Sequence, residues 1–145
     1  FRSSLFFQCA VHEIAEMGRG IMESDEWLKQ SDYDMETAEY MFQGGRYFYA
    51  VFMCHMTIEK ALKGVFHQRY NELPPKTHNL IYLLNKVMAK PEEPIGRFVA
   101  KLNESSVATR YPEQIESLQK AYTKDIVRDI IDKTGETLSW IKKLL

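Results

Sequence analysis

The sequence has little of what marks secreted, membrane-spanning or nucleic-acid-coating proteins. Its only cysteines, Cys9 and Cys54, are too few for a disulfide scaffold and favour a reducing, cytoplasmic setting. Its 19 basic and 20 acidic residues give a net charge of −1, so it has no global electrostatic attraction for nucleic acid, although a local basic patch is still compatible with this balance. The apolar run "LFFQCAV" near the N-terminus is broken by Gln8 and is far too short to span a bilayer.

Strand signals and several catalytic motifs are also missing. There is no long alternating apolar–polar run and no Asn-Gly hairpin dipeptide. The phosphate-binding patterns G-x-x-x-x-G-K-[ST] and G-x-G-x-x-G are absent, and "HEIAE" at residues 12–16 lacks the second histidine of the zinc-protease motif. No histidine has a glutamate three residues before it, so the di-iron pattern of ferritin-like bundles is missing.

What the sequence does contain is helical periodicity along nearly all of its 145 residues, with 45% hydrophobic residues to form a core. Glycine pairs and prolines divide this pattern, at Gly44–Gly45, Pro74–Pro75 and Pro91–Pro94. The expected helices span residues 4–17, 24–43, 46–70, 79–90, 95–106 and 123–145, with an irregular segment at 105–114. We therefore predict an all-α fold, an up-and-down antiparallel bundle of five to six helices at 23–145, preceded by a helical extension at 1–22.

Polar residues stand on the apolar face of the 46–70 helix. At 100° per residue, His55 and Glu59 lie one turn apart inside the apolar arc, Lys63 borders it, and Lys60 lies well outside. Taken alone, Lys60 and Lys63 are both expected to be ordinary solvated lysines. Asp34 falls on the apolar face of the preceding helix. Because burial of an unpaired polar group is costly, the pattern predicts a shared polar network. That network is either a structural device that fixes helix register or the floor of a polar pocket.

Two further polar residues stand in or beside expected loops. His78 lies in "PPKTHNL", where Thr77 or Asn79 could cap the next helix, so the histidine either helps the helix start or serves a site. Arg110 lies in "TRYP", where it either covers a helix end or binds phosphate. Loop residues on a rigid scaffold often carry function, which makes both of them candidate site residues.

Together these pieces resemble the HEPN domain family (higher eukaryotes and prokaryotes nucleotide-binding domain). The matching stretches are "EWLKQSDYDMETAEYMFQGGRYFYAVFMCHMTIEKALKGV", "PPKTHNLIYLL", "TRYP" and a closing "LSWIKKLL", which together span most of residues 24–145. The residues whose order and spacing carry the resemblance are Trp27, Asp34, Ala50, His55, Glu59, Lys60, Ala61, Lys63, His78, Leu80, Arg110, Tyr111 and Pro112.

The resemblance implies a helical bundle that dimerises, and a choice among several activities. Some members are ribonuclease toxins, others pair with small nucleotidyltransferases in toxin–antitoxin-like modules, and others are attributed nucleotide binding. The ribonuclease branch is marked by an arginine followed four to six residues later by a histidine. Here Arg69 and His78 have eight residues between them, and Arg110 has no histidine after it. The departure argues against RNA cleavage.

We therefore expect a non-catalytic module that binds a nucleotide or a partner, with no cofactor and no metal. The expected ligand-binding residues are His55, Glu59, Lys63, His78, Arg110 and Tyr111, supported by Asp34. In this interpretation Lys63 and Arg110 contact phosphate and Tyr111 stacks on a base. Two alternatives are a ribonuclease toxin that uses His78 as acid or base with Arg110 on the phosphate, and a ligand-free helical dimerisation domain.

Overall fold

The computed structural model describes residues 24–108 and 115–145, and within these ranges the chain forms six α-helices and no strand. The helices are α2 (Ser24–Gln43), α3 (Tyr47–Tyr70), α4 (Leu80–Lys86), α5 (Glu93–Ala108), α6 (Ile115–Ala121) and α7 (Lys124–Lys142). The prediction of an all-α helical bundle is confirmed. No helix in these ranges is long and apolar enough to cross a membrane. The extension expected at residues 1–22 lies outside the described residues.

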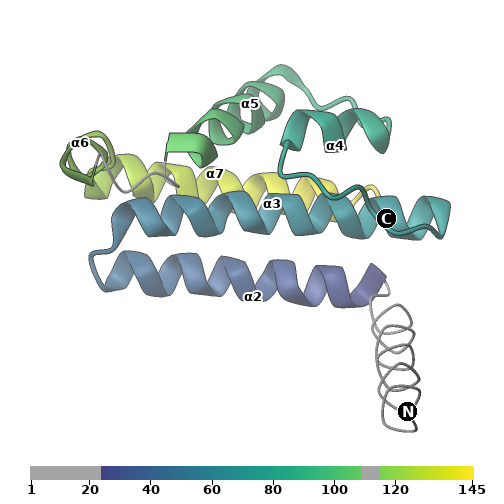
Figure 1. The fold of residues 1–145 in the computed structure, drawn as a ribbon, viewed down its shortest axis with the longest axis horizontal. Coiled ribbons are helices and arrows are strands. Elements are labelled where there is room, and N and C mark those ends of the chain that lie inside the picture. The colour runs from purple at the N-terminus through teal and green to yellow at the C-terminus, as the bar shows by residue number, and fades with distance from the viewer. Residues whose placement is uncertain (1–23, 109–114) are drawn as a thin grey trace, which may run out of the picture.

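Helix α3 is the centre of the bundle. Figure 1 shows α2 running antiparallel along one side of α3, α4 and α5 on the opposite side, and α7 alongside, while α6 lies at the end where α3 begins. Each of the other five helices contacts α3. Consequently α3 is buried around most of its circumference, and its fully buried side chains include Val51, Ile58, Leu62 and Val65.

The turn between α2 and α3 is set by its two glycines. Gly45 adopts φ +74°, a left-handed conformation that glycine reaches without the steric cost of a Cβ atom. The Gly45 N–H donates to the Phe42 carbonyl, and the Arg46 N–H donates to the Met41 carbonyl at 2.8 Å. These two bonds form the Schellman motif that closes a helix C-terminus. The predicted helix stop is therefore observed, and it places α2 and α3 side by side.

The second half of the chain departs from the expected boundaries. Helix α4 ends at Lys86, because Met88 adopts φ +55°, which ends the helical path four residues before the expected boundary. Helix α5 continues to Ala108, into the segment expected to be irregular. Helix α6 was not among the expected helices. Its seven residues span less than two helical turns, which is too short for a periodic apolar pattern to show. Thr123 holds the N-cap position of α7, but its side chain makes no capping hydrogen bond.

Ion pairs join α2 to α7. The Arg128 guanidinium donates two hydrogen bonds to the Glu39 carboxylate, at 2.9 and 2.5 Å, and lies 4.9 Å from the centre of the Phe42 ring. The Arg128 hydrogen bond is the main cause that lowers the pKa of Glu39. Near the other end of the same contact, Lys142 donates to Asp32 at 2.6 Å. These two ion pairs connect α2 to α7 through residues that are 89 and 110 positions apart in the sequence.

Candidate functional site

The polar residues predicted on the inner face of α3 are buried in the structure. His55 is fully buried, Glu59 is 3% exposed and Lys63 is 8% exposed. They lie on successive turns of α3, so their side chains stack along one side of the helix. The first turns of α4 and the 71–79 connection cover this side, which brings His78 to the same place. We call His55, Glu59, Lys63 and His78 the Glu59 cluster.

Glu59 is the acceptor at the centre of the Glu59 cluster. The Lys63 ammonium donates to Glu59 Oε1 at 2.8 Å, and His78 Nδ1 donates to Glu59 Oε2 at 2.9 Å. His55 Nδ1 lies 3.7 Å from the same Oε2 atom. Burial pushes the pKa of Glu59 upward, but the hydrogen bonds from Lys63 and His78 outweigh it and hold the pKa below its usual value. The carboxylate is therefore ionised at neutral pH and only accepts hydrogen bonds.

The two histidines of the Glu59 cluster have different tasks. His55 Nε2 donates to the backbone carbonyl of His78 at 2.9 Å, because a carbonyl can only accept. This bond ties the connection before α4 to the middle of α3. The His78 side chain is 59% exposed, although its Nδ1 is held by the buried carboxylate. With the Nδ1 proton fixed in this way, Nε2 is the nitrogen of the His78 ring left to meet a ligand.

Asp34 belongs to a second pair instead of the Glu59 cluster. Its carboxylate lies 2.6 Å from the Lys60 ammonium, and the two side chains are only 8% and 19% exposed. The expectation that Lys60 is an ordinary solvated lysine is therefore wrong. The angular argument treated α3 as a helix with one buried face, whereas α2 also packs on α3 and its Asp34 reaches Lys60. Only the arrangement of the neighbouring helices shows whether a lysine at this position is solvated or packed against a second helix.

Lys63 also differs from its expected place at the border of the apolar face. Its ammonium is buried against Glu59 and lies 5.7 Å from the centre of the Trp27 ring, a cation–π contact between α3 and α2. Trp27 is part of the family pattern but is not among the expected site residues. Of the six expected ligand-binding residues, the structure brings together His55, Glu59, Lys63 and His78. The other two, Arg110 and Tyr111, lie outside the described residues.

Two hollows lie away from the Glu59 cluster. One, of about 440 Å³, is bordered by Arg46, by the aromatic residues that open α3, and by α6. The other, of about 280 Å³, lies between α5 and α7. No sequence pattern signals either hollow, because each is formed between separate helices. Among residues 24–108 and 115–145, no three histidine, cysteine or acidic side chains are placed to hold a metal ion.

These observations define the class of protein: an all-helical bundle in which a buried carboxylate holds a surface histidine. Within it, the chain belongs to the HEPN domain family, whose model matches residues 24–144. Two solved structures are similar. TT1696 from Thermus thermophilus is 22% identical with a TM-score of 0.73, covering 84% of this chain and 98% of that one. ST0689, an archaeal HEPN homologue, is 23% identical with a TM-score of 0.68, covering 86% and 100%. No curated protein matches.

Proposed function

We propose that the chain is a non-catalytic HEPN module that binds a nucleotide, or the nucleotide-bearing face of a partner, at the Glu59 cluster. The observation that carries this proposal is the exposed His78 imidazole held at 2.9 Å by a buried, ionised carboxylate. In its protonated form the ring offers Nε2–H to a phosphate oxygen without having to be reoriented, which reduces the entropic cost of binding.

The same contacts argue against acid–base catalysis at this place. Glu59 is 3% exposed, its oxygens already accept from Lys63 and His78, and its pKa is lowered, so it is poorly suited to take a proton from a substrate. The Lys63 ammonium is committed to Glu59. His78 is then the accessible group of the Glu59 cluster. A single accessible group suits ligand recognition better than acid–base catalysis, which needs both an acid and a base.

Calorimetric titration with AMP, ATP and GTP tests the proposal. The wild-type chain is expected to bind, and His78→Ala to lower affinity at least tenfold, since a charge-assisted hydrogen bond is worth about 1.5–3 kcal/mol. His67→Ala is the matched control, because His67 lies on α3 beyond the Glu59 cluster and contacts the Glu72 carbonyl at 3.0 Å. No heat at millimolar nucleotide, for the chain alone and with its partner protein, would overturn nucleotide binding.

The partner that we propose is a small nucleotidyltransferase, in a toxin–antitoxin-like pair, and the chain itself is proposed to be a homodimer. Both proposals rest on membership of the HEPN family. Co-expression of the chain with a small nucleotidyltransferase encoded beside it is expected to give a complex that co-elutes on gel filtration. Sedimentation velocity of the chain alone is expected to give a dimer. Separate elution of the two proteins would refute the pairing, and a monomer in sedimentation would refute the dimer.

A ribonuclease is the second candidate, because a carboxylate 2.9 Å from a histidine nitrogen is also how catalytic histidines are oriented. In that case the purified protein cleaves total RNA, and both His78→Ala and Arg110→Ala abolish the cleavage. Identical RNA banding from the wild type and the two variants would end this alternative and leave the binding module.

A further inference from the structure

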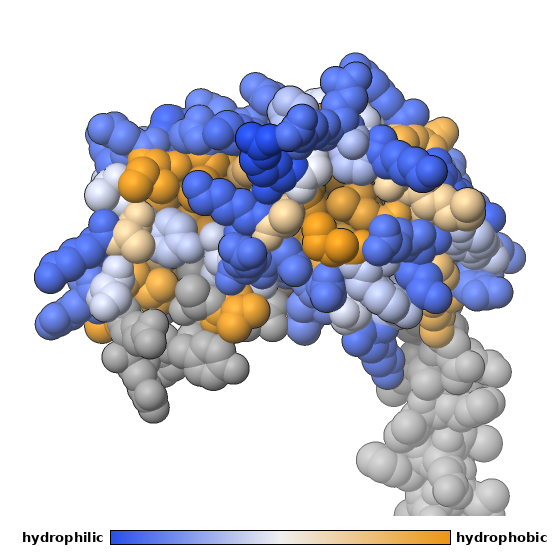
Figure 2. Space-filling model, turned by 90° about the horizontal axis from the view of Figure 1, so that it is seen from above, coloured by the Kyte–Doolittle hydropathy of each residue, from blue (hydrophilic) through white to orange (hydrophobic). Residues whose placement is uncertain are grey.

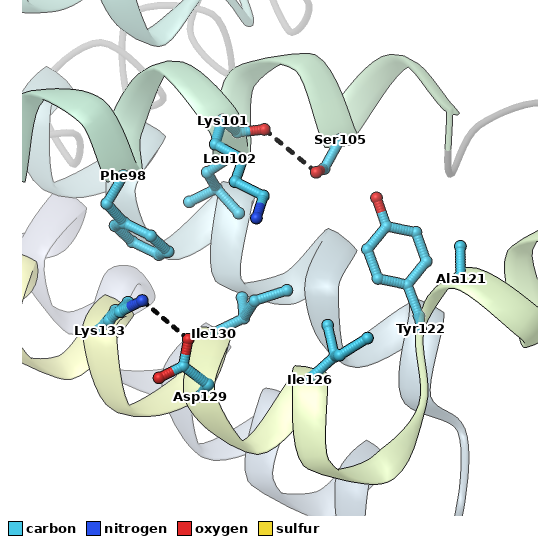
Figure 3. Close-up of a pocket in the computed structure, with 10 residues that line it drawn as sticks. All are labelled: Phe98, Lys101, Leu102, Ser105, Ala121, Tyr122, Ile126, Asp129, Ile130 and Lys133. Atoms are coloured by element: carbon cyan, nitrogen blue, oxygen red, sulfur yellow. Dashed lines mark hydrogen bonds and ion pairs between the residues drawn. The ribbon is translucent and has the colours of Figure 1, made fainter.

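A cavity of about 280 Å³ opens between α5 and α7, away from the Glu59 cluster. Both helices pack on α3, yet they make little contact with each other, so their facing sides diverge above the central helix. Ala121 and Tyr122, where α6 ends and α7 is about to begin, close one end of this space (Figure 3). None of the residues of the Glu59 cluster lines it. The cavity is thus a separate feature of the fold.

The cavity has an apolar part, to which α5 and α7 both contribute, and a charged border. Phe98 and Leu102 point from α5 toward Ile126 and Ile130 on α7, as Figure 3 shows. Ile126 is 46% exposed, although it lines the same cavity as the buried Leu102. Viewed from above, the molecule has apolar surface showing between hydrophilic residues (Figure 2). An apolar group placed in the space that these side chains line would gain dispersion contacts and would be removed from water.

The charges of the cavity leave one cation without a counter-ion. Lys133 lies 2.8 Å from Asp129, and these two lining residues neutralise each other. Lys101, the remaining charged lining residue, forms no ion pair within residues 24–108 and 115–145. Figure 3 shows its ammonium reaching from α5 into the space between the helices. The lining therefore carries a net positive charge beside an apolar wall.

We propose that this cavity binds a small monocarboxylic acid, with the apolar body between α5 and α7 and the carboxylate on Lys101. A single negative charge matches the single uncompensated cation, while Asp129 disfavours a ligand with more negative charge. The volume lies near the lower limit of about 300 Å³ for small-molecule pockets, which favours a short chain or a single ring. The Tyr122 hydroxyl, at the end of the cavity, adds a hydrogen-bond donor.

Calorimetry with three ligands of one length tests the charge requirement. Octanoate is expected to bind more tightly than octanol, and octanol more tightly than octylamine, which is cationic at neutral pH. Lys101→Met keeps roughly the length of the side chain but removes its charge. It is expected to lower the affinity for octanoate roughly tenfold and to leave the affinity for octanol unchanged. Lys120→Met is the matched control, because Lys120 is an exposed lysine on neighbouring α6 that does not line the cavity.

A second variant tests the place of binding. Ala121→Trp puts a large ring at the exposed end of the cavity and is expected to abolish binding of both octanoate and octanol, with an unchanged circular dichroism spectrum. His78→Ala is expected to leave octanoate binding intact, so this inference and the proposed function fail independently. Absence of octanoate binding at millimolar concentration, equal binding of octanoate and octylamine, or insensitivity to Lys101→Met or Ala121→Trp would overturn the inference.

Discussion

Replacing Glu59 by glutamine tests how much the buried charge network contributes to stability. The substitution keeps the size of the side chain but removes its charge, and it leaves the Lys63 ammonium, 8% exposed, without its counter-ion. It also weakens the hydrogen bond that holds His78 at 2.9 Å. Removing one partner of a buried ion pair costs about 3–5 kcal/mol, because the remaining charge is left desolvated and unpaired.

We therefore expect Glu59→Gln to lower the free energy of unfolding by about 3–5 kcal/mol, a large part of the roughly 5–15 kcal/mol of a typical domain. For a chain of this size the melting temperature would fall by roughly 10 °C. Urea denaturation at pH 7, followed by circular dichroism, measures the loss. Glu59→Gln combined with Lys63→Met is expected to be more stable than the additive sum of the single changes, since both charges are then gone.

Asp129→Asn is the matched control for this experiment. Asp129 pairs with Lys133 at the same i, i+4 spacing and the same 2.8 Å as Glu59 with Lys63, but the side chains are 61% and 51% exposed. Surface ion pairs contribute about 0–1 kcal/mol, so this control is expected to change little. If Glu59→Gln costs no more than Asp129→Asn, the Glu59 cluster does not stabilise the fold in the way the contacts indicate.

The effect of Glu59→Gln is also expected to depend on pH. The pKa of Glu59 is lowered in the folded state, so its contribution to stability is complete above its ordinary value of 4.5 and is lost as pH falls through the folded value. The difference in stability between wild type and variant should be constant near neutral pH and should narrow in acid. A difference that widens below pH 4.5 would contradict the assigned direction of the shift.

Three further changes follow from single contacts. Gly45→Ala is expected to cost about 1 kcal/mol in urea denaturation because of its φ of +74°, whereas Gly44→Ala, which meets only ordinary contacts, should be nearly neutral; equal effects would contradict the turn assignment. Lys60→Met should cost more than about 1 kcal/mol, since Asp34 would stay buried and unpaired, and a smaller loss would show that the pair is solvated. Cys54, whose pKa burial raises to about 12, should resist iodoacetamide at pH 8 in the folded protein, and rapid alkylation seen by mass spectrometry would contradict this.

Features that depend on a few neighbouring residues could be predicted from the sequence. The Gly44–Gly45 stop and the Pro74–Pro75 break are set by local backbone sterics, and both fall where the sequence predicts. The seven-residue α6 could not be predicted in this way, because a helix that short depends on the packing around it more than on its own propensity. The early end of α4 at Lys86, two residues before Met88, likewise had no signal, since methionine rarely adopts a positive φ.

The sequence by itself determined the fold class and the presence of polar residues on the inner face of α3, because helical periodicity and chain breakers are local properties. Only the tertiary structure decided how those residues pair. It brings His78 to Glu59 from 19 positions away, and it pairs Asp34 with Lys60 and not with the Glu59 cluster. The physical reason is that burial and charge pairing depend on which helices surround α3, and no single helix carries that information in its own pattern.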